Sequence, residues 1–125
     1  MKVYYAHCMA IYNTPQEDRD EATLASLGFT VVNPNSPEVE SDLAIMRDNG
    51  ATREETMLYF KKFATETDAI AFRGLPDGRI PSGVALEIKW FEEKNKPVIE
   101  LPSRVHTRMI SLDETREYLH EVGQR

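Results

Sequence analysis

Short apolar runs alternate along the chain with longer segments whose apolar residues recur at helical spacing. The runs expected to form strands are 3–6, 29–32, 68–72 and 97–101, and Met109-Ile110 would add a short one. The segments expected to form helices are 17–27, 40–48, 53–64, 83–95 and 112–122. In the first, the apolar residues are Ala22, Leu24, Ala25 and Leu27, and Gly28 ends it; in the third, Thr52 is the expected N-cap with Glu55 as its capping-box partner. Strands and helices that alternate in this way are typical of a parallel sheet between helices. We therefore expect one α/β domain over residues 1–125, a three-layer sandwich of flavodoxin-like or Rossmann-like type with four or five parallel strands.

Charge and cysteine content indicate which partners and which compartment the protein has. The formal net charge is −6, and the basic residues are scattered. A duplex-binding surface needs clustered Lys and Arg, so we expect no duplex nucleic acid partner. Cys8 is the only cysteine, which fits a reducing compartment, and no apolar run approaches the ~18 residues that span a bilayer. The sequence predicts a cytoplasmic protein that binds a small molecule and not a membrane.

The strand exits are the expected ligand site, because open parallel sheets bind ligands beyond the carboxyl ends of their strands. His7 follows the first strand and either contacts substrate or is a satisfied loop histidine. Asn35 follows the second and either contacts a sugar or closes an Asx turn. Arg73 follows the third and either reaches an anionic substrate or is a solvated loop charge. Asp68 starts its strand at the opposite edge, so we interpret it as a cap or turn acid.

Glu87 is the acid that the pattern does not explain. It lies in SGVALEIKW, which otherwise resembles the buried face of a helix, and its neighbours one turn away carry no charge. With Ser82 as the expected N-cap, the acidic position of a capping box would be Ala85. Burial would raise the pKa of Glu87, while the helix dipole and nearby hydroxyls would lower it. Glu87 is either an exposed residue with other neighbours or a nucleophile or base at the predicted crevice.

A family resemblance favours the second interpretation. TDAIAFRGLPDGRIPSGVALEIKWFEEKNKPVIEL resembles the strand, loop, SGxxxE helix and next strand of the nucleoside 2-deoxyribosyltransferase superfamily, which includes nucleotide N-glycoside hydrolases. With VYYAH and NPN, the resemblance covers most of the chain up to about Leu101. It implies that Glu87 is the nucleophile, with Tyr4 near it. It also implies that Ser82 and Gly83 help to hold sugar or phosphate.

The resemblance implies a double displacement at the N-glycosidic bond of a nucleoside or nucleotide. Glu87 would attack the anomeric carbon, the base would leave, and water or a second base would release the sugar. Neither a metal nor an organic cofactor is implied. Hydrolysis and transfer differ only in the acceptor, so the residues favour neither. Tyr4 and Tyr5 point to opposite faces of their strand, so only one of them can approach Glu87.

Three positions depart from the family pattern. The glycine-rich turn after the first strand, which lets phosphate-preferring members bring backbone N–H groups to an anion, is replaced by AHCMAIYNT, where His7, Tyr12 and Asn13 are polar enough to line a pocket. Where the family often carries a second acid before the third strand, this chain has Met57-Leu58-Tyr59-Phe60. Where it often carries an aspartate before the Ser-Gly pair, this chain has Pro81, and Asp77 in the same loop is the candidate to replace it.

The resemblance also bears on assembly, because a neighbouring subunit often completes the pocket in this superfamily. It therefore implies a homodimer or higher homo-oligomer, with Ser103, Arg104 and His106 as candidate residues acting in trans. Three alternatives stay open. One is a nucleotide-binding sensor without catalysis, and another is an interaction module that uses the aromatic helix 53–64. The third is an enzyme acting on a different ribosyl compound, such as a dinucleotide.

Overall fold

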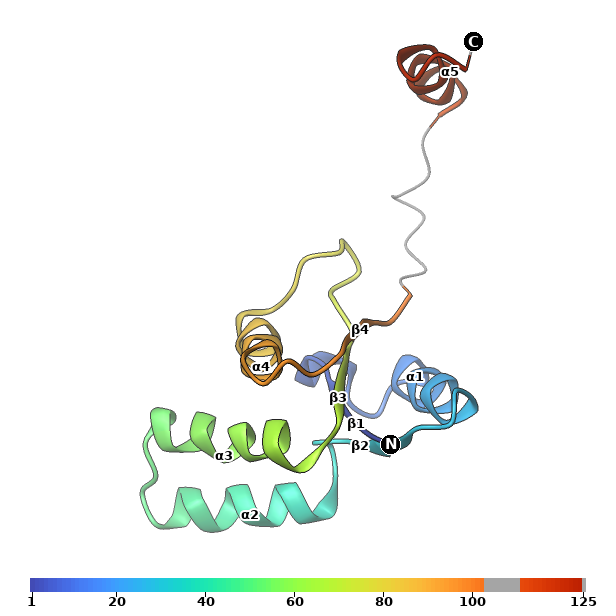
Figure 1. Cartoon of the computed structure of the whole chain (residues 1–125). Helices are drawn as coiled ribbons and strands as arrows, with labels where there is room; N and C mark the ends of the chain where they lie inside the picture. Colours follow the sequence, from blue (N-terminus) through green and yellow to red (C-terminus); the bar gives the residue numbers. More distant parts are fainter. Residues whose placement is uncertain (103–110, 125) are drawn as a thin grey trace.

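A computed structural model of the chain describes residues 1–102 and 111–124 and shows a four-stranded parallel sheet between helices (Figure 1). The strands are β1 (Lys2–Ala6), β2 (Thr30–Val32), β3 (Ala69–Phe72) and β4 (Val98–Glu100). The helices are α1 (Pro15–Ser26), α2 (Pro37–Asp48), α3 (Arg53–Glu66), α4 (Ser82–Glu93) and α5 (Leu112–Glu121), with a 3₁₀ turn η1 (Met9–Ile11). The predicted three-layer α/β fold is confirmed. Met109-Ile110, Ser103, Arg104 and His106 lie outside the described residues.

The strand order is β2-β1-β3-β4, with every neighbouring pair parallel. Tyr4 lies opposite Val32 on one side and Ile70 on the other. The chain runs outward from β1 to β2 and then returns to place β3 on the other side of β1. The loops that leave β1 and β3 therefore meet at a topological switch point, where open α/β sheets bind ligands.

Alternation along β1 separates two apolar clusters, one on each face of the sheet. Tyr4 faces a cluster that includes Phe63 of α3 and Phe91 of α4, whereas Tyr5 faces a smaller one with Leu24 of α1. Figure 1 shows α3 and α4 on one side of the strands and α1 on the other. The prediction that Tyr4 and Tyr5 point to opposite faces is confirmed.

Sequence signals at the helix ends were interpreted correctly in some places and wrongly in others. The capping box of Thr52 and Glu55 is present, and Gly28 adopts a positive φ of 92° after α1. In contrast, α2 begins earlier than predicted because Ser36 caps it and Pro37 occupies its first turn. The assignment of Ser82 as an N-cap is wrong, since Ser82 is already the first residue of α4.

The buried face of α1 also differs from the prediction. The predicted apolar stripe was Ala22, Leu24, Ala25 and Leu27, but only Leu24 is buried, and Leu27 is 64% exposed. The face that packs on the sheet carries Glu17, Asp20 and Leu24, spaced at i, i+3 and i+7. Two carboxylates are thus turned toward the interior.

Asp68 behaves as predicted for a turn acid, because its carboxylate accepts the backbone N–H of Lys2 at 2.8 Å. None of the helices within the described ranges has the length and apolar character required to cross a membrane.

Candidate active site at the carboxyl edge of the sheet

Glu87 and Tyr4 form a hydrogen-bonded pair between α4 and β1. The hydroxyl of Tyr4 donates to Oε2 of Glu87. The Tyr4 ring is 1% exposed and is held between Phe63 and Phe91, with ring centroids 4.8 and 6.0 Å away. Glu87 is half-buried, so its carboxylate is partly shielded from water while a fixed phenol holds one of its oxygens. The two residues that the resemblance brings together are in contact.

Burial controls the ionisation of this pair. It raises the pKa of Glu87 to about 7, and the hydrogen bond from Tyr4 offsets only part of that rise. Burial, followed by the nearby Glu87 carboxylate, raises the pKa of Tyr4 well above its usual value. Tyr4 therefore stays a neutral donor, while Glu87 exchanges its proton near neutral pH. A carboxyl group that titrates near the working pH is suited to nucleophilic or base catalysis.

The first turn of α4 differs from that of the other α-helices. Side chains of Thr14, Ser36, Thr52 and Ser111 cap α1, α2, α3 and α5. At α4 the cap residue is Pro81, which makes no side-chain cap bond, and no acid lies in the first turn. Ser82 is exposed, and a Cβ built on Gly83 would meet nothing within 4 Å. The start of this helix is open, one turn before Glu87.

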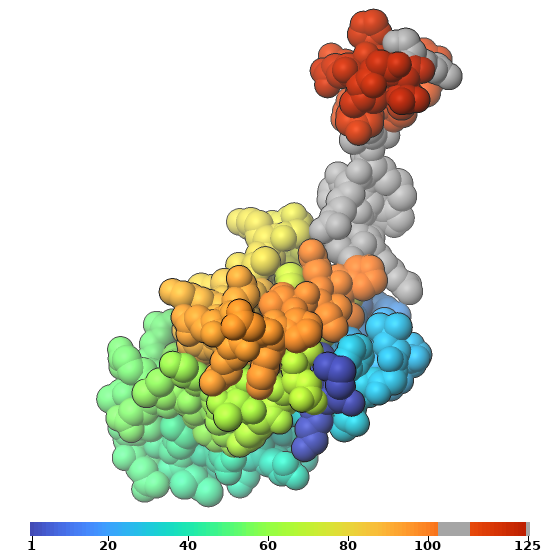
Figure 2. Space-filling view, viewed as in Figure 1, coloured from blue at the N-terminus to red at the C-terminus, as the bar shows by residue number. Residues whose placement is uncertain are grey.

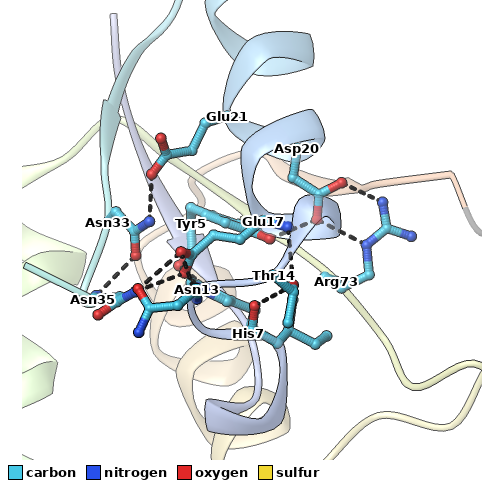
Figure 3. Close-up of polar contacts among 11 residues, drawn as sticks. Tyr5, His7, Asn13, Thr14, Glu17, Asp20, Glu21, Asn33, Asn35 and Arg73 are labelled. Carbon is cyan, nitrogen blue, oxygen red and sulfur yellow. Dashed lines mark hydrogen bonds and ion pairs between the residues drawn. The ribbon is translucent and has the colours of Figure 1, made fainter.

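A second group of polar side chains lies on the α1 face of the sheet (Figure 3). Arg73 donates to Asp20 through Nε at 2.9 Å and Nη2 at 2.5 Å, and Tyr5 donates to the same carboxylate at 2.5 Å. Burial opposes the ionisation of Asp20, but the bonds from Arg73, Tyr5 and Gln16 outweigh it and lower the pKa of Asp20. Arg73 also donates to the carbonyl of Pro102 at 2.6 Å. The alternative that Arg73 is a solvated loop charge is wrong, because the residue is buried and ion-paired.

His7 and Asn35 meet at Glu17 (Figure 3). His7 Nε2 lies 2.7 Å from Glu17 Oε2, and His7 Nδ1 lies 3.1 Å from the carbonyl of Tyr5. The amide of Asn35 donates to Glu17 at 3.0 and 3.1 Å and to Asn13 at 3.1 Å. Neither ring nitrogen of His7 is available to a ligand while these bonds hold, which is the arrangement of a satisfied loop histidine. The Asx turn beside Asn35 is closed by Asn33, whose side chain accepts the Asn35 N–H at 2.8 Å.

Tyr12 lies between the two groups. Burial, followed by the carboxylates of Glu87 and Glu17, raises the pKa of Tyr12 to about 12. Its ring is tilted against that of His7, with centroids 4.8 Å apart. Because both carboxylates act on its phenol, Tyr12 lies near the Tyr4–Glu87 pair and also near Glu17 and its hydrogen-bond partners.

Two hollows open beside the strand ends. The larger, of about 630 Å³, lies between the loops after β1 and β3 and has no carboxylate in its described lining. The smaller, of about 360 Å³, lies at the end of β2 and the start of α2 and is lined in part by Phe63. Neither is lined by Glu87 or Tyr4. The smaller one borders the ring that stacks on Tyr4, whereas the larger one is bordered by the side chains of Arg19 and Arg73.

The remaining predicted site residue within the described chain is Asp77. Its carboxylate accepts the Arg79 N–H at 3.0 Å and pairs with the Arg79 side chain at 2.5 Å in its own exposed turn. The backbone bond from Arg79, followed by that side chain, lowers the pKa of Asp77. Asp77 is thus already paired in the turn.

Sequence reasoning missed Glu17 and Asp20. Both carried a usable signal, since they share a helix face with the buried Leu24, and acids on the sheet-facing side of a helix need buried partners.

No group of three or more His, Cys, Asp or Glu side chains that could hold a metal ion exists within residues 1–102 and 111–124. Protein-family models, curated proteins and solved structures offer no match to this chain.

Proposed function

We propose that this protein cleaves or transfers at the N-glycosidic bond of a nucleoside or nucleotide, with Glu87 as the nucleophile. The observation that carries the proposal is the half-buried Glu87 carboxyl, bonded to a neutral Tyr4 and without a cationic partner in that bond. A structural carboxylate in the same protein, Asp20, is paired with arginine instead. Because Glu87 is shielded from water without such a cation, its carboxylate is basic enough to form a covalent bond to the sugar carbon and to release it again.

The reaction proceeds in two displacements. Oε1 of Glu87, which Tyr4 does not hold, attacks C1′ of the sugar as the C1′–N bond breaks and its electron pair leaves with the base. The base takes up a proton from solvent. Water, or the nitrogen of a second base, then attacks C1′ and loses a proton to solvent, while the C1′–Oε1 bond breaks and Glu87 leaves as a carboxylate. Tyr4 acts as a positioning residue, because it fixes the orientation of the carboxylate in both steps.

The open start of α4 supports binding of the sugar end of the substrate. The exposed Ser82 hydroxyl and the space over Gly83 lie one turn before Glu87, where unpaired helix N–H groups favour oxygen-rich or anionic groups. Asn35 and Arg73 hold the neighbouring loops through Glu17 and Asp20, so in this proposal they shape the crevice. We place the reaction in the cytoplasm, where a free thiol such as that of Cys8 stays reduced.

The test is to incubate the purified protein with a panel of nucleosides and 5′-nucleotides, with and without a second free base, and to measure released base. We expect release by the wild type and a loss of at least ~10³-fold in Glu87→Gln, because the stepwise route needs the carboxylate. Intact-mass spectrometry of the quenched reaction should show the protein plus one glycosyl group in the wild type alone.

The matched control is Glu93→Gln, which changes an exposed acid of the same helix and should keep full activity. Base release that survives in Glu87→Gln would refute the mechanism. Binding of a nucleotide without turnover by the wild type would instead support the sensor function.

A further inference from the structure

The larger hollow, between the loops after β1 and β3, has two largely apolar walls. One wall is the 3₁₀ turn η1 with Ala10 and Ile11, and the other is the loop after β3 with Leu75 and Pro76. Figure 2 shows this second loop, coloured yellow, projecting from the sheet and its helices. At about 630 Å³ the hollow lies within the range of small-molecule sites, roughly 300–1,000 Å³. It therefore has room for a ligand with an apolar body.

Hydrogen bonds hold both walls in place. At η1, the N–H of Ile11 donates to the carbonyl of Cys8 at 2.9 Å, and the hydroxyl of Thr14 donates to the carbonyl of Ile11 at 2.5 Å. In the loop after β3, the N–H of Leu75 donates to the carbonyl of Arg79 at 2.8 Å. Because both walls are already ordered, a ligand that binds between them loses little affinity to the cost of ordering the protein.

Arg19 brings unused hydrogen-bond donors to this lining. The other polar side chains there are engaged by the fold, since the hydroxyl of Thr14 is bonded, Gln16 donates to Asp20 at 2.9 Å, and Arg73 is paired with Asp20. Arg19 is exposed, and its Nη2 donates to Oε1 of Gln16 at 3.2 Å. A guanidinium has five N–H donors, so most of those of Arg19 remain for a ligand.

The charge of Arg19 is also unneutralised, because this residue forms no ion pair within residues 1–102 and 111–124. The described lining of the hollow holds Arg19 and Arg73 and neither Asp nor Glu, although the formal net charge of the chain is −6. Asp20 neutralises Arg73, which leaves one free positive charge. A single carboxylate balances that charge and can accept two parallel bonds from a guanidinium. A phosphate monoester carries about −1.5 to −2 at neutral pH and would leave excess negative charge beside apolar walls.

We propose that this hollow binds a small molecule with one carboxylate and an apolar body. The carboxylate lies on Arg19, and the body lies between η1 and the loop after β3. Neither Glu87 nor Tyr4 lines the hollow, so this is a second site, apart from the candidate active site. Binding depends on Arg19 and the two walls and does not depend on the proposed chemistry.

The first experiment titrates the full-length chain with octanoate, 1-octanol, octyl phosphate and butanoate and follows the backbone amide signals by NMR. Octanoate should bind most tightly and should shift the amides of Ala10, Ile11 and Leu75. 1-Octanol should bind about 10-fold more weakly, because it lacks the charge-assisted bonds to Arg19. Butanoate should bind at least ~10-fold more weakly, because it buries a shorter apolar chain. Octyl phosphate should also bind more weakly than octanoate.

The second experiment repeats the titrations with three variants. Arg19→Gln should weaken octanoate binding about 10-fold and leave 1-octanol binding unchanged. The matched control is Arg47→Gln, which changes an exposed arginine of α2 outside the lining and should affect neither probe. Ala10→Trp should fill the hollow and weaken the binding of both probes. Ala10 is exposed, so far-UV circular dichroism of this variant should show an intact fold.

Equal affinity of the wild type for octanoate and 1-octanol would overturn the proposal, and so would octanoate binding that Arg19→Gln leaves unchanged. Tighter binding of octyl phosphate than of octanoate would overturn the assignment of a carboxylate. Amide shifts confined to other parts of the chain would place the ligand elsewhere and would also overturn it. Absence of octanoate binding would do the same, and it is the result expected if another part of the chain occupies the hollow.

Discussion

Tyr4 and Tyr5 are adjacent in β1, and each donates its hydroxyl to a carboxylate, but the two carboxylates behave in opposite ways. Tyr5 bonds to Asp20, whose pKa is lowered because Arg73 supplies two further charge-assisted bonds. Tyr4 bonds to Glu87, whose pKa is raised because burial outweighs the hydrogen bond from this one neutral donor. The guanidinium makes the difference. It keeps Asp20 ionised, whereas Glu87, which lacks it, holds its proton more tightly.

The substitution Tyr4→Phe tests this contrast. Because the Tyr4 bond lowers the pKa of Glu87, its loss should shift the acidic limb of the kcat/KM profile to higher pH. The rate at neutral pH should fall about 10- to 100-fold, the value of a hydrogen bond to a charged group. The measurement is base release as a function of pH. Tyr5→Phe, on the other face of the same strand, should reduce stability and leave that limb in place. An equal shift in both variants would contradict a specific role for Tyr4.

Helix α4 is built differently from its neighbours, and the difference lies in its first turn. Side chains close the starts of α1, α2, α3 and α5, whereas α4 begins with Pro81, Ser82 and Gly83. An uncapped start costs helix stability, since its N–H groups lack side-chain acceptors. In the proposed reaction, this uncapped turn and Glu87 one turn later would both face the substrate.

Gly83→Ala separates the two roles of this turn. The added Cβ meets no atom within 4 Å, and alanine should stabilise the helix by about 0.5–1 kcal/mol. If the sugar lies over Gly83, the same methyl group should raise KM about 10-fold or more. Thermal denaturation and steady-state kinetics measure the two effects. The control, Ala85→Gly, should lower stability without raising KM. A stabilised Gly83→Ala enzyme with unchanged KM would place the substrate elsewhere.

Local signals predicted the fold well because they depend on near neighbours in the chain. The alternation of strands and helices and the Thr52–Glu55 capping box were all recovered. The buried face of α1 was not, because alanine and leucine were taken as the apolar stripe when the interior side carries Glu17 and Asp20. Burial of those acids depends on His7, in the loop ten residues before Glu17, and on Arg73, 53 residues beyond Asp20, so it could not be predicted from the helix alone. The sequence pattern identified Glu87 as unusual, but only the packed structure shows its bond to Tyr4.

Within the described chain, two kinds of shielded acid lie on the two faces of one sheet: Glu17 and Asp20 are buried, and Glu87 is half-buried. On the α1 face, Glu17 and Asp20 tie together the loops after β1, β2 and β3 and the chain beyond β4. For both, burial raises the pKa, but their hydrogen bonds outweigh it and lower the pKa. They therefore stabilise the fold at neutral pH, and this stability is lost as pH falls through their folded-state pKa values. Glu87, on the α4 face, has a raised pKa, so its contribution to stability changes with pH in the opposite direction.

Comparing the free energy of unfolding of the wild type and Glu87→Gln at different pH values should reveal this opposite pH dependence. The folded pKa of Glu87 is about 7, above its ordinary value of 4.5, so between these values the folded state binds more protons than the unfolded state. Stability contributed by the neutral acid is present below pH ~4.5 and is lost as pH rises through ~7. Glutamine cannot ionise. The variant should therefore match the wild type near pH ~4 and exceed it by up to about 3 kcal/mol near pH ~8.

Urea denaturation at both pH values gives the two free energies of unfolding. Glu93→Gln, exposed on the same helix, should show no such pH-dependent gain. An equal effect of Glu87→Gln at both pH values would mean that the carboxyl ionises as freely as one in water. The nucleophile would then lack the raised basicity that the proposed reaction needs. A gain confined to high pH, combined with loss of base release, would show that the fold gives up stability to keep this acid reactive.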